Sequence, residues 1–181
     1  MKRACRYLAA ALLPAVALAA YSATPLVQQV LPDKDSVKGF GILEGSLQYG
    51  KGDDISKIYN GGYEIYTNNG VIDAARQMYM REKDYVEVTV HSMKSEKAAL
   101  DFLKYWQKQY KVKSLAKTKT RSGFVVTKPS VMSHFVVGKY FTTVNAFYGE
   151  EKAAKDVAAF TTAVEKRILK LTKPPSSPKG K

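Results

Sequence analysis

The stretch that decides the architecture spans residues 53–70 and reads Asp53-Asp54-Ile55-Ser56-Lys57-Ile58-Tyr59-Asn60-Gly61-Gly62-Tyr63-Glu64-Ile65-Tyr66-Thr67-Asn68-Asn69-Gly70. In a helical conformation its apolar residues share one face, with the i, i+3, i+4, i+7 spacing of a helix against a core: Ile55, Ile58, Tyr59, Gly62, Ile65 and Tyr66. Asp53 or Asp54 suits the N-cap, and Gly70 suits a left-handed helix end. We therefore predict one helix across this stretch.

Gly61 and Gly62 interrupt the helical pattern, and each glycine costs a helix interior about 1 kcal/mol relative to alanine. On one interpretation, Gly62 lets a neighbouring strand or helix pass close to the backbone. On the other, the pair opens the helix and exposes backbone N–H groups to a ligand. An unbroken helix leaves Glu64 in solvent, opposite the apolar face, whereas a break at the glycines turns Asn60 and Glu64 toward a cleft.

The same stretch carries a resemblance to a known family. Residues 59–66 resemble the Ile-Asn-Gly-Gly-Ala-Glu-x-Tyr segment of a group of exported bacterial proteins classed as a domain of unknown function. Residues 85–99 resemble the second hallmark of that family, a strand with a central Glu that runs into a helix starting Ser-x-x-Ala. The likeness covers most of residues 38–170, with Tyr59 and Tyr63 standing where the family has Ile and Ala. The resemblance implies export and a shared fold, and it implies no chemistry.

The N-terminus has the pattern of a secretory signal peptide over residues 1–20. A basic start precedes an apolar run, and Ala17-Leu18-Ala19 forms a small-x-small cleavage site. The alternative is an uncleaved anchor running to about Val27, but the run is short for a span of about 20 residues and contains Pro14. We expect cleavage between about residues 19 and 24, and a mature protein that is periplasmic or secreted.

Cys5 is the only cysteine, and it lies inside the expected signal peptide. The mature chain then has no disulfide, thiolate metal site or cysteine nucleophile. Proline and polar residues predict a linker across residues 21–37, followed by a single domain across 38–172. Residues 173–181 are rich in proline, serine and lysine and predict a disordered basic tail.

The chain is basic, because 29 Lys and Arg against 16 Asp and Glu give a formal charge of +13. No acidic residue lies between positions 104 and 128. The candidate anionic-surface patch consists of Lys104, Lys108, Lys111, Lys113, Lys117, Lys119 and Arg121. Such a patch attracts polyanions and anionic membranes, so we expect at most weak contact with an anionic envelope surface; alternatively, the charge only keeps the domain soluble. Nucleic acid is not an expected partner, since an exported protein rarely meets it.

After Gly70 the hydrophobic period changes to two. Residues 71–80 and 85–93 predict a β-hairpin, with Val86, Val88 and Val90 on one face and Tyr85, Glu87, Thr89 and His91 on the other. Ser95 then caps a helix to about Tyr110, with Trp106 on its apolar side. Strands follow near residues 124–137 and 140–148, with Pro129 at an edge or bulge, and a last helix runs from about Glu150 to Leu171.

An internal repeat links the two halves. Residues 96–101, Glu-Lys-Ala-Ala-Leu-Asp, match residues 151–156 at five of six positions, at an offset of 55 residues. The flanking hydrophobic pattern agrees, so we interpret it as a strand–strand–helix unit used twice. The predicted fold class is α+β: an antiparallel sheet of four to six strands from two strand–strand–helix repeats, plus an N-terminal Gly-Gly helix. If both faces of the sheet are covered, the repeat helices lie on one face and the Gly-Gly helix on the other.

Few residues could carry chemistry. No catalytic signature appears, and His91 and His134 lack acids at metal-cage spacing, so we expect no cofactor and no metal. Glu87 is the one acid within an apolar strand, and Arg76 on the adjacent strand is its natural partner in a structural ion pair. Alternatively these residues line a ligand site, whose candidates are Asn60, Gly61, Gly62, Glu64, Tyr66, Arg76 and Glu87.

Three functions fit these observations. The first is an exported, monomeric, non-catalytic module that binds a ligand or a protein partner. The second is an anionic-surface binder that works through the basic patch between Lys104 and Lys128. The third is an enzyme of unrecognised type with a site around Asn60, Glu64 and Glu87, which needs its two carboxylates within reach across a cleft.

Overall fold

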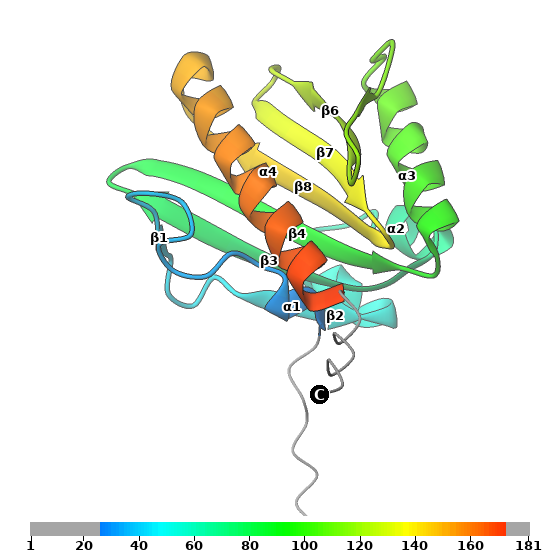
Figure 1. Ribbon diagram of the computed structural model, residues 1–181. Helices are drawn as coiled ribbons and strands as arrows, with labels where there is room; N and C mark the ends of the chain where they lie inside the picture. The colour runs from blue at the N-terminus through cyan, green and yellow to red at the C-terminus, as the bar shows by residue number, and fades with distance from the viewer. Residues whose placement is uncertain (1–25, 173–181) are drawn as a thin grey trace, which may run out of the picture.

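An eight-stranded antiparallel sheet runs through residues 26–172, the part of the chain that this computed structural model describes (Figure 1). Its strands are β1 (Gly41–Ile42), β2 (Gln48–Lys51), β3 (Val71–Arg81), β4 (Asp84–Met93), β5 (Ala116–Lys117), β6 (Ser122–Val126), β7 (Val131–Val137) and β8 (Tyr140–Ala146). The order is β1-β3-β4-β8-β7-β6-β5, and β2 also pairs with β3. The α+β class is confirmed. The sheet exceeds four to six strands because the short β1, β2 and β5 add to the long strands.

The β3–β4 hairpin follows the predicted alternation. Val86, Val88 and Val90 of β4 are fully buried in one core, whereas Glu87 and His91 face the other side of the sheet. Strand β4 then pairs with β8, which joins the two hairpins at the centre of the sheet. Polar residues of the two central strands therefore meet on one face.

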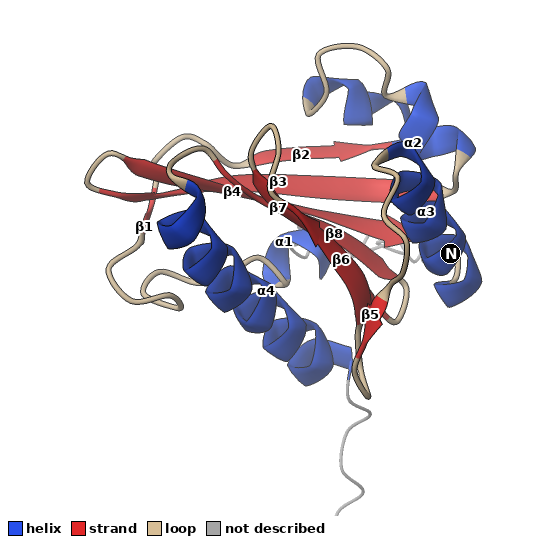
Figure 2. Cartoon of the chain, turned by 90° about the horizontal axis from the view of Figure 1, so that it is seen from above, coloured by secondary structure: helices blue, strands red, loops and turns tan. Residues whose placement is uncertain are grey.

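The two long helices, α3 (Glu96–Gln109) and α4 (Glu150–Thr172), pack on opposite faces of the sheet (Figures 1 and 2). Ser95 caps α3 as predicted, since its hydroxyl accepts the N–H of Ala98 at 3.1 Å. The expectation that both repeat helices share a face is wrong. At the offset of 55, Val86 corresponds to Phe141, but Val86 lies in the core beneath α4 and Phe141 in the core beneath α3. Equivalent positions of the two units therefore face opposite ways.

The core beneath α4 includes residues that precede the predicted domain start at residue 38. Val27 of α1 (Leu26–Gln29) is buried there, together with Val30 and Leu31. The hydroxyl of Tyr79 donates to the carbonyl oxygen of Pro32 at 2.7 Å. The domain therefore begins within the stretch that the sequence predicts as a linker.

Several expectations fall on other parts of the chain. The predicted signal peptide (residues 1–20), the first five residues of the predicted linker and the predicted basic tail (residues 173–181) lie outside the described residues. Within residues 26–172, no helix combines the length and apolarity needed to cross a membrane.

The single strand expected across residues 124–137 is a hairpin of β6 and β7. Val126 pairs with Met132, so Pro129 lies in the connection between the two strands. The prediction of an edge or bulge position for Pro129 is wrong. Proline has no N–H to contribute to a ladder, and here it ends the strand instead of distorting it.

Candidate functional site

The Gly-Gly segment, residues 53–70, does not form one helix. A 3-10 helix, η1 (Gly52–Lys57), ends before the glycines, and α2 (Glu64–Asn68) begins after them. Gly61 and Gly62 have φ values of +89° and +70°, a conformation that a right-handed helix excludes and that glycine adopts without strain. A Cβ added at either position would meet no atom within 4 Å. The close-packing interpretation is therefore wrong, and the pair forms a turn.

This turn brings Tyr59 and Tyr66 together, with ring centroids 3.8 Å apart and planes inclined at 15°. Tyr66 also stacks on His91 of β4, at 5.2 Å between centroids. Four candidate site residues are solvent-exposed and lie outside the pocket described below: Asn60, Gly61, Gly62 and Glu64. The other three candidates, Tyr66, Arg76 and Glu87, line that one pocket.

The floor of the pocket is a polar strip across the sheet face beneath α3. One cross-strand row runs over β3, β4, β8 and β7 and consists of Arg76, Thr89, Thr143 and His134. The next row runs over β4, β8 and β7 and consists of Glu87, Asn145 and Met132. The opposite face of these strands is apolar, with buried Val86, Val88 and Val144. Concentration of polar groups on one covered face favours a binding site over an ordinary core.

Side chains from α3 and the Gly-Gly segment close the pocket over this floor. The walls are aromatic and consist of Tyr59, Tyr66, Trp106 and Tyr110. The pocket measures about 190 Å³. An engineered protein cavity of about 150 Å³ holds benzene. The pocket therefore has room for a molecule of about one ring.

Arg76 and Glu87 form the ion pair expected from the sequence, with 3.3 Å between Nε and Oε2. About a fifth of each side chain is exposed, 22% and 21%. Burial raises the pKa of Glu87, and the guanidinium of Arg76 opposes this shift. Nε of Arg76 also donates to the hydroxyl of Thr89 at 3.4 Å, and the guanidinium carbon lies 5.2 Å from the centre of the Tyr59 ring. The pair provides the pocket with one cation and one carboxylate.

His91 is fully buried beside the Tyr59–Tyr66 stack, and both of its ring nitrogens have partners. Nδ1 donates to the carbonyl oxygen of Phe141 at 3.1 Å, and Nε2 accepts from the hydroxyl of Tyr59. This pattern assigns the neutral tautomer with its proton on Nδ1. Burial lowers the pKa of His91 to about 3. His91 therefore holds Tyr59 in place as a neutral acceptor.

Trp106 and His134 both line the pocket and stack with 5.9 Å between ring centroids and 11° between planes. Nδ1 of His134 lies 3.2 Å from the hydroxyl of Thr143. Burial lowers the pKa of His134 to about 4, so its ring is neutral near pH 7. Trp106 Nε1 and His134 Nε2 are buried and have no hydrogen-bond partner within residues 26–172. An unpaired buried polar group costs about 1–3 kcal/mol. Tyr140, Thr142 and Thr161 also carry buried oxygens without a partner among the described residues, so such atoms do not single out this pocket. The covered polar floor with the Arg76–Glu87 ion pair is the stronger indication that the pocket takes a polar ligand.

Sequence reasoning assigned Trp106 to the core and did not single out Thr143 or Asn145. Trp106 does contact core residues, including Phe102 at 5.9 Å between ring centroids, but it also forms the pocket wall. A signal for the two β8 residues was present in the sequence. Thr143 and Asn145 flank a valine in β8 as Glu87 and Thr89 do in β4. Matching polar positions on two strands indicate a shared polar face once the strands are known to pair.

A second hollow of about 220 Å³ lies between α4 and β6. Small and apolar residues dominate its lining, among them Gly123, Ala154 and Ala158. Its charged residue, Arg121, already pairs with Glu165 at 2.6 Å, and its other polar groups are hydroxyls. The smaller pocket beneath α3 holds the ion pair and the neutral histidine, so we take it as the candidate site.

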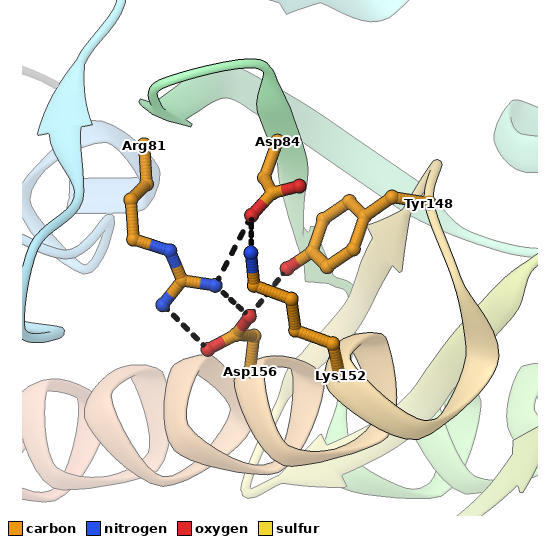
Figure 3. Close-up of polar contacts among 5 residues, drawn as sticks. All are labelled: Arg81, Asp84, Tyr148, Lys152 and Asp156. Carbon is orange, nitrogen blue, oxygen red and sulfur yellow. Dashed lines mark hydrogen bonds and ion pairs between the residues drawn. The ribbon is translucent and has the colours of Figure 1, made fainter.

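A separate cluster of charges joins the β3–β4 turn to the start of α4 (Figure 3). Arg81 donates to both carboxylate oxygens of Asp156, at 3.1 Å from Nη1 to Oδ1, and the hydroxyl of Tyr148 donates to the same carboxylate at 2.7 Å. Lys152 pairs with Asp84 at 2.5 Å. Each charge has an opposite partner inside the cluster, so we interpret it as a structural tie between the hairpin and the helix.

The two-carboxylate enzyme site is not assembled. Glu64 is exposed on α2, whereas Glu87 lies in the pocket beneath α3. Across residues 26–172, no three His, Asp or Glu side chains come together in a way that could hold a metal ion. The arrangement in the pocket is suited to binding through hydrogen bonds and one ion pair.

The expected basic patch lies on α3 and the loop and strand that follow. Its exposed members are Lys104, Lys108, Lys111, Lys113, Lys117 and Lys119. Arg121 is only partly exposed and pairs with Glu165, so its assignment to the patch is corrected. Lys104 lies 3.7 Å from the carboxylate of Asp101. Five lysines of the patch therefore remain without an ion pair among the described residues.

Comparison with known proteins adds little. No protein-family model matches the chain, and no curated protein matches it. A similar solved structure is the extracellular domain of PknH from Mycobacterium tuberculosis, with 11% sequence identity and a TM-score of 0.41. The match covers 70% of this chain and 81% of that chain. So distant a likeness bears on neither the pocket nor its ligand, and the family resemblance of residues 59–66 stays a prediction.

Proposed function

We propose that the chain is an exported, non-catalytic module that binds a small molecule in the pocket beneath α3. The observation that carries the proposal is the covered polar floor of the pocket, where Arg76 and Glu87 form an ion pair beneath aromatic side chains. Small-molecule sites combine apolar or aromatic walls with a few convergent polar groups, and this pocket has aromatic walls over a polar floor. The signal-peptide pattern of residues 1–20 and the resemblance of residues 59–66 support export.

Binding fits the pocket better than catalysis. His91 has both ring nitrogens engaged, and Glu87 already faces the cation of Arg76. A general acid or base needs free access to the proton that it moves. The NH2 group of Asn145 instead offers donors that do not titrate near neutral pH, which suits recognition of a ligand.

Trp106 provides the test, because it is the only tryptophan of the chain and lines the pocket. We expect single-ring compounds in a screen to change its fluorescence on binding. Thr143→Met fills the pocket and should remove the response, whereas Thr162→Met, at an exposed position of α4, should keep it. The proposal is wrong if no compound of the screen changes the signal of the folded protein, or if Thr143→Met responds like the wild type.

A second candidate function is weak attachment to anionic envelope surfaces. It is favoured by exposed lysines on α3 and after it that have no ion pair within residues 26–172, such as Lys108, Lys111 and Lys113. Each basic residue near an anionic membrane contributes about 1 kcal/mol, and physiological salt screens the attraction beyond a Debye length of about 8 Å. Charge reversal at these three positions should abolish co-sedimentation with anionic vesicles at low salt. Absence of co-sedimentation of the wild type at low salt would rule this function out.

A further inference from the structure

We propose that the pocket recognises the carboxylate of a small ring-bearing organic acid through Arg76, and that the bound anion replaces Glu87 as the partner of Arg76 while Glu87 takes up a proton. This inference rests on the proposed function, because it names the ligand class of the same pocket. The proton comes from solvent, and no covalent bond of the ligand forms or breaks.

The guanidinium of Arg76 contacts neighbouring side chains through Nε, and its two terminal nitrogens remain available to a ligand. Its closest approach to Glu87 is through Nε, at 3.3 Å, and Nε also donates to Thr89 at 3.4 Å. Within the described chain, no hydrogen bond runs from its two terminal nitrogens to another residue. The ring of Tyr59 lies 5.2 Å from the guanidinium carbon. Two parallel N–H groups on a positioned guanidinium match the two oxygens of a carboxylate.

Apart from the carboxylate of Glu87, the free polar groups that line the pocket include two further donors. The amide oxygen of Asn145 accepts from the hydroxyl of Ser130 at 2.6 Å, which leaves its NH2 group to donate. The hydroxyl of Thr89 accepts from Arg76 and retains its own hydrogen. A ligand that supplies acceptors, such as a carboxylate, satisfies more of these groups than a ligand that supplies donors.

The walls favour a ring over a long chain. Tyr66, Tyr110 and Met132 provide apolar contact on the sides of the pocket, and its volume of about 190 Å³ fits a single ring with a short substituent. Phosphate alone would meet the same donors but would leave this apolar surface uncovered. The geometry therefore favours an aromatic or alicyclic monocarboxylate.

Proton uptake follows from the charges around Glu87. The charged and titratable groups that face it are Arg76 from β3, Tyr59 and Tyr66 from the Gly-Gly segment, Tyr110 from α3 and His134 from β7. Of these only Arg76 is charged near neutral pH, because burial keeps His134 neutral and the tyrosines titrate far higher. A second anion on Arg76 removes the main group that favours the ionised form of Glu87. The pKa of Glu87 therefore rises when a carboxylate binds.

The sign of the pH dependence is fixed by this linkage. A group whose pKa rises on binding takes up a proton, so the ligand binds more tightly as pH falls. A free carboxylic acid keeps its own charge above about pH 5, since such groups titrate near pH 4. Between about pH 5.5 and about pH 8, tighter binding at the lower pH therefore reports a group of the protein and not the ligand, and the Glu87→Gln variant shows whether that group is Glu87.

Benzoate and its neutral counterpart benzamide test the proposal by calorimetric titration of the full mature chain at these two pH values. We expect benzoate to bind at least about tenfold more tightly than benzamide, as a charge-assisted hydrogen-bond pair provides. Benzoate should bind more tightly at the lower pH, with net proton uptake measured in two buffers of different ionisation enthalpy. Benzamide should show no pH dependence.

Conservative variants at Arg76 and Glu87 show which residue causes the preference for benzoate and which takes up the proton. Arg76→Lys keeps the charge and loses the paired N–H groups, so benzoate affinity should fall about tenfold while benzamide affinity stays unchanged. Arg121→Lys, at the other hollow, is the matched control and should change neither. Glu87→Gln should bind benzoate without proton uptake. The comparison of benzoate with benzamide on the wild type needs no variant to fold.

The outcomes separate this inference from the proposed function. If other compounds of the screen change the Trp106 signal and benzoate binds no more tightly than benzamide, the carboxylate inference is wrong and the binding function stands. If benzoate binds without proton uptake, the exchange at Glu87 is wrong. If no compound of the screen binds, both proposals are wrong.

Discussion

The hydroxyl of Tyr59 donates a hydrogen bond to Nε2 of His91, and this contact fastens the Gly-Gly segment to the centre of the sheet. His91 is fully buried, and its other nitrogen donates to the carbonyl oxygen of Phe141 at 3.1 Å. Tyr59 in turn stacks on Tyr66, so one buried hydrogen bond positions two walls of the pocket.

Tyr59→Phe should therefore destabilise the protein and loosen the pocket. The substitution leaves Nε2 of His91 buried without a partner, which costs about 1–3 kcal/mol. Unfolding in urea measures the loss. Tyr63→Phe is the matched control, because Tyr63 lies in the same segment and its hydroxyl has no hydrogen bond among the described residues. Equal stability of Tyr59→Phe and the wild type would contradict the assigned contact.

Stability should fall with acidification before the carboxylates titrate. Burial holds the pKa of His91 at about 3 and that of His134 at about 4, below the value of about 6.5 in an unfolded chain. The unfolded chain then binds more protons, so stability is complete above about pH 6.5 and is lost as pH falls toward these values. Urea titrations between about pH 7 and about pH 5 measure the slope. His134→Phe should reduce it, and a flat profile for the wild type would contradict the burial of both rings.

Gly62→Ala should cost about 1–2 kcal/mol, because an L-residue is strained at a φ of +70°. The space around the position is open, so Gly62→Leu should cost about as much as Gly62→Ala and not more. Gly149→Ala is the control, since that position has neither a positive φ nor a neighbour within 4 Å of an added Cβ. A much larger loss for the leucine variant in urea melts would restore the close-packing interpretation.

Asp156→Asn should destabilise the tie between the β3–β4 turn and α4 by roughly 1.5–3 kcal/mol, the range for hydrogen bonds to charged groups. Its carboxylate accepts from Arg81 and Tyr148 and is largely buried. Asp101→Asn removes an exposed helical ion pair and should leave the melting temperature unchanged. Ligand binding beneath α3 should survive Asp156→Asn as long as the variant is folded, because the cluster lies outside the pocket.

The parts of the fold that depend on local sequence could be predicted. The alternation of Val86, Val88 and Val90 fixed the hairpin, and the Ser95 cap fixed the start of α3. The prediction of a continuous Gly-Gly helix was also wrong for a local reason. The spacing of apolar residues does not reveal the positive φ angles of Gly61 and Gly62. Two-residue strands such as β1 and β5 have no pattern of their own and exist only through pairing with a longer strand.

Only some of the residues of the candidate site could be predicted from the sequence. Arg76 and Glu87 were paired correctly because they lie on two strands of one hairpin, whose register follows from the turn. Asn145 joins Glu87 only through the pairing of β4 with β8, which connects residues far apart in the chain. Asn60 and Glu64 were misplaced because their direction depended on the shape of the glycine turn.

The most direct test of the central claim, that a ligand completes the pocket beneath α3, is the indole N–H signal of Trp106 in a proton–nitrogen NMR spectrum. The chain has one tryptophan, so the signal is unambiguous. With the tightest-binding compound of the screen, the signal should shift, because Trp106 lines the pocket, in the wild type and in Thr162→Met but not in Thr143→Met. A signal that stays in place while the compound shifts resonances elsewhere would contradict the account.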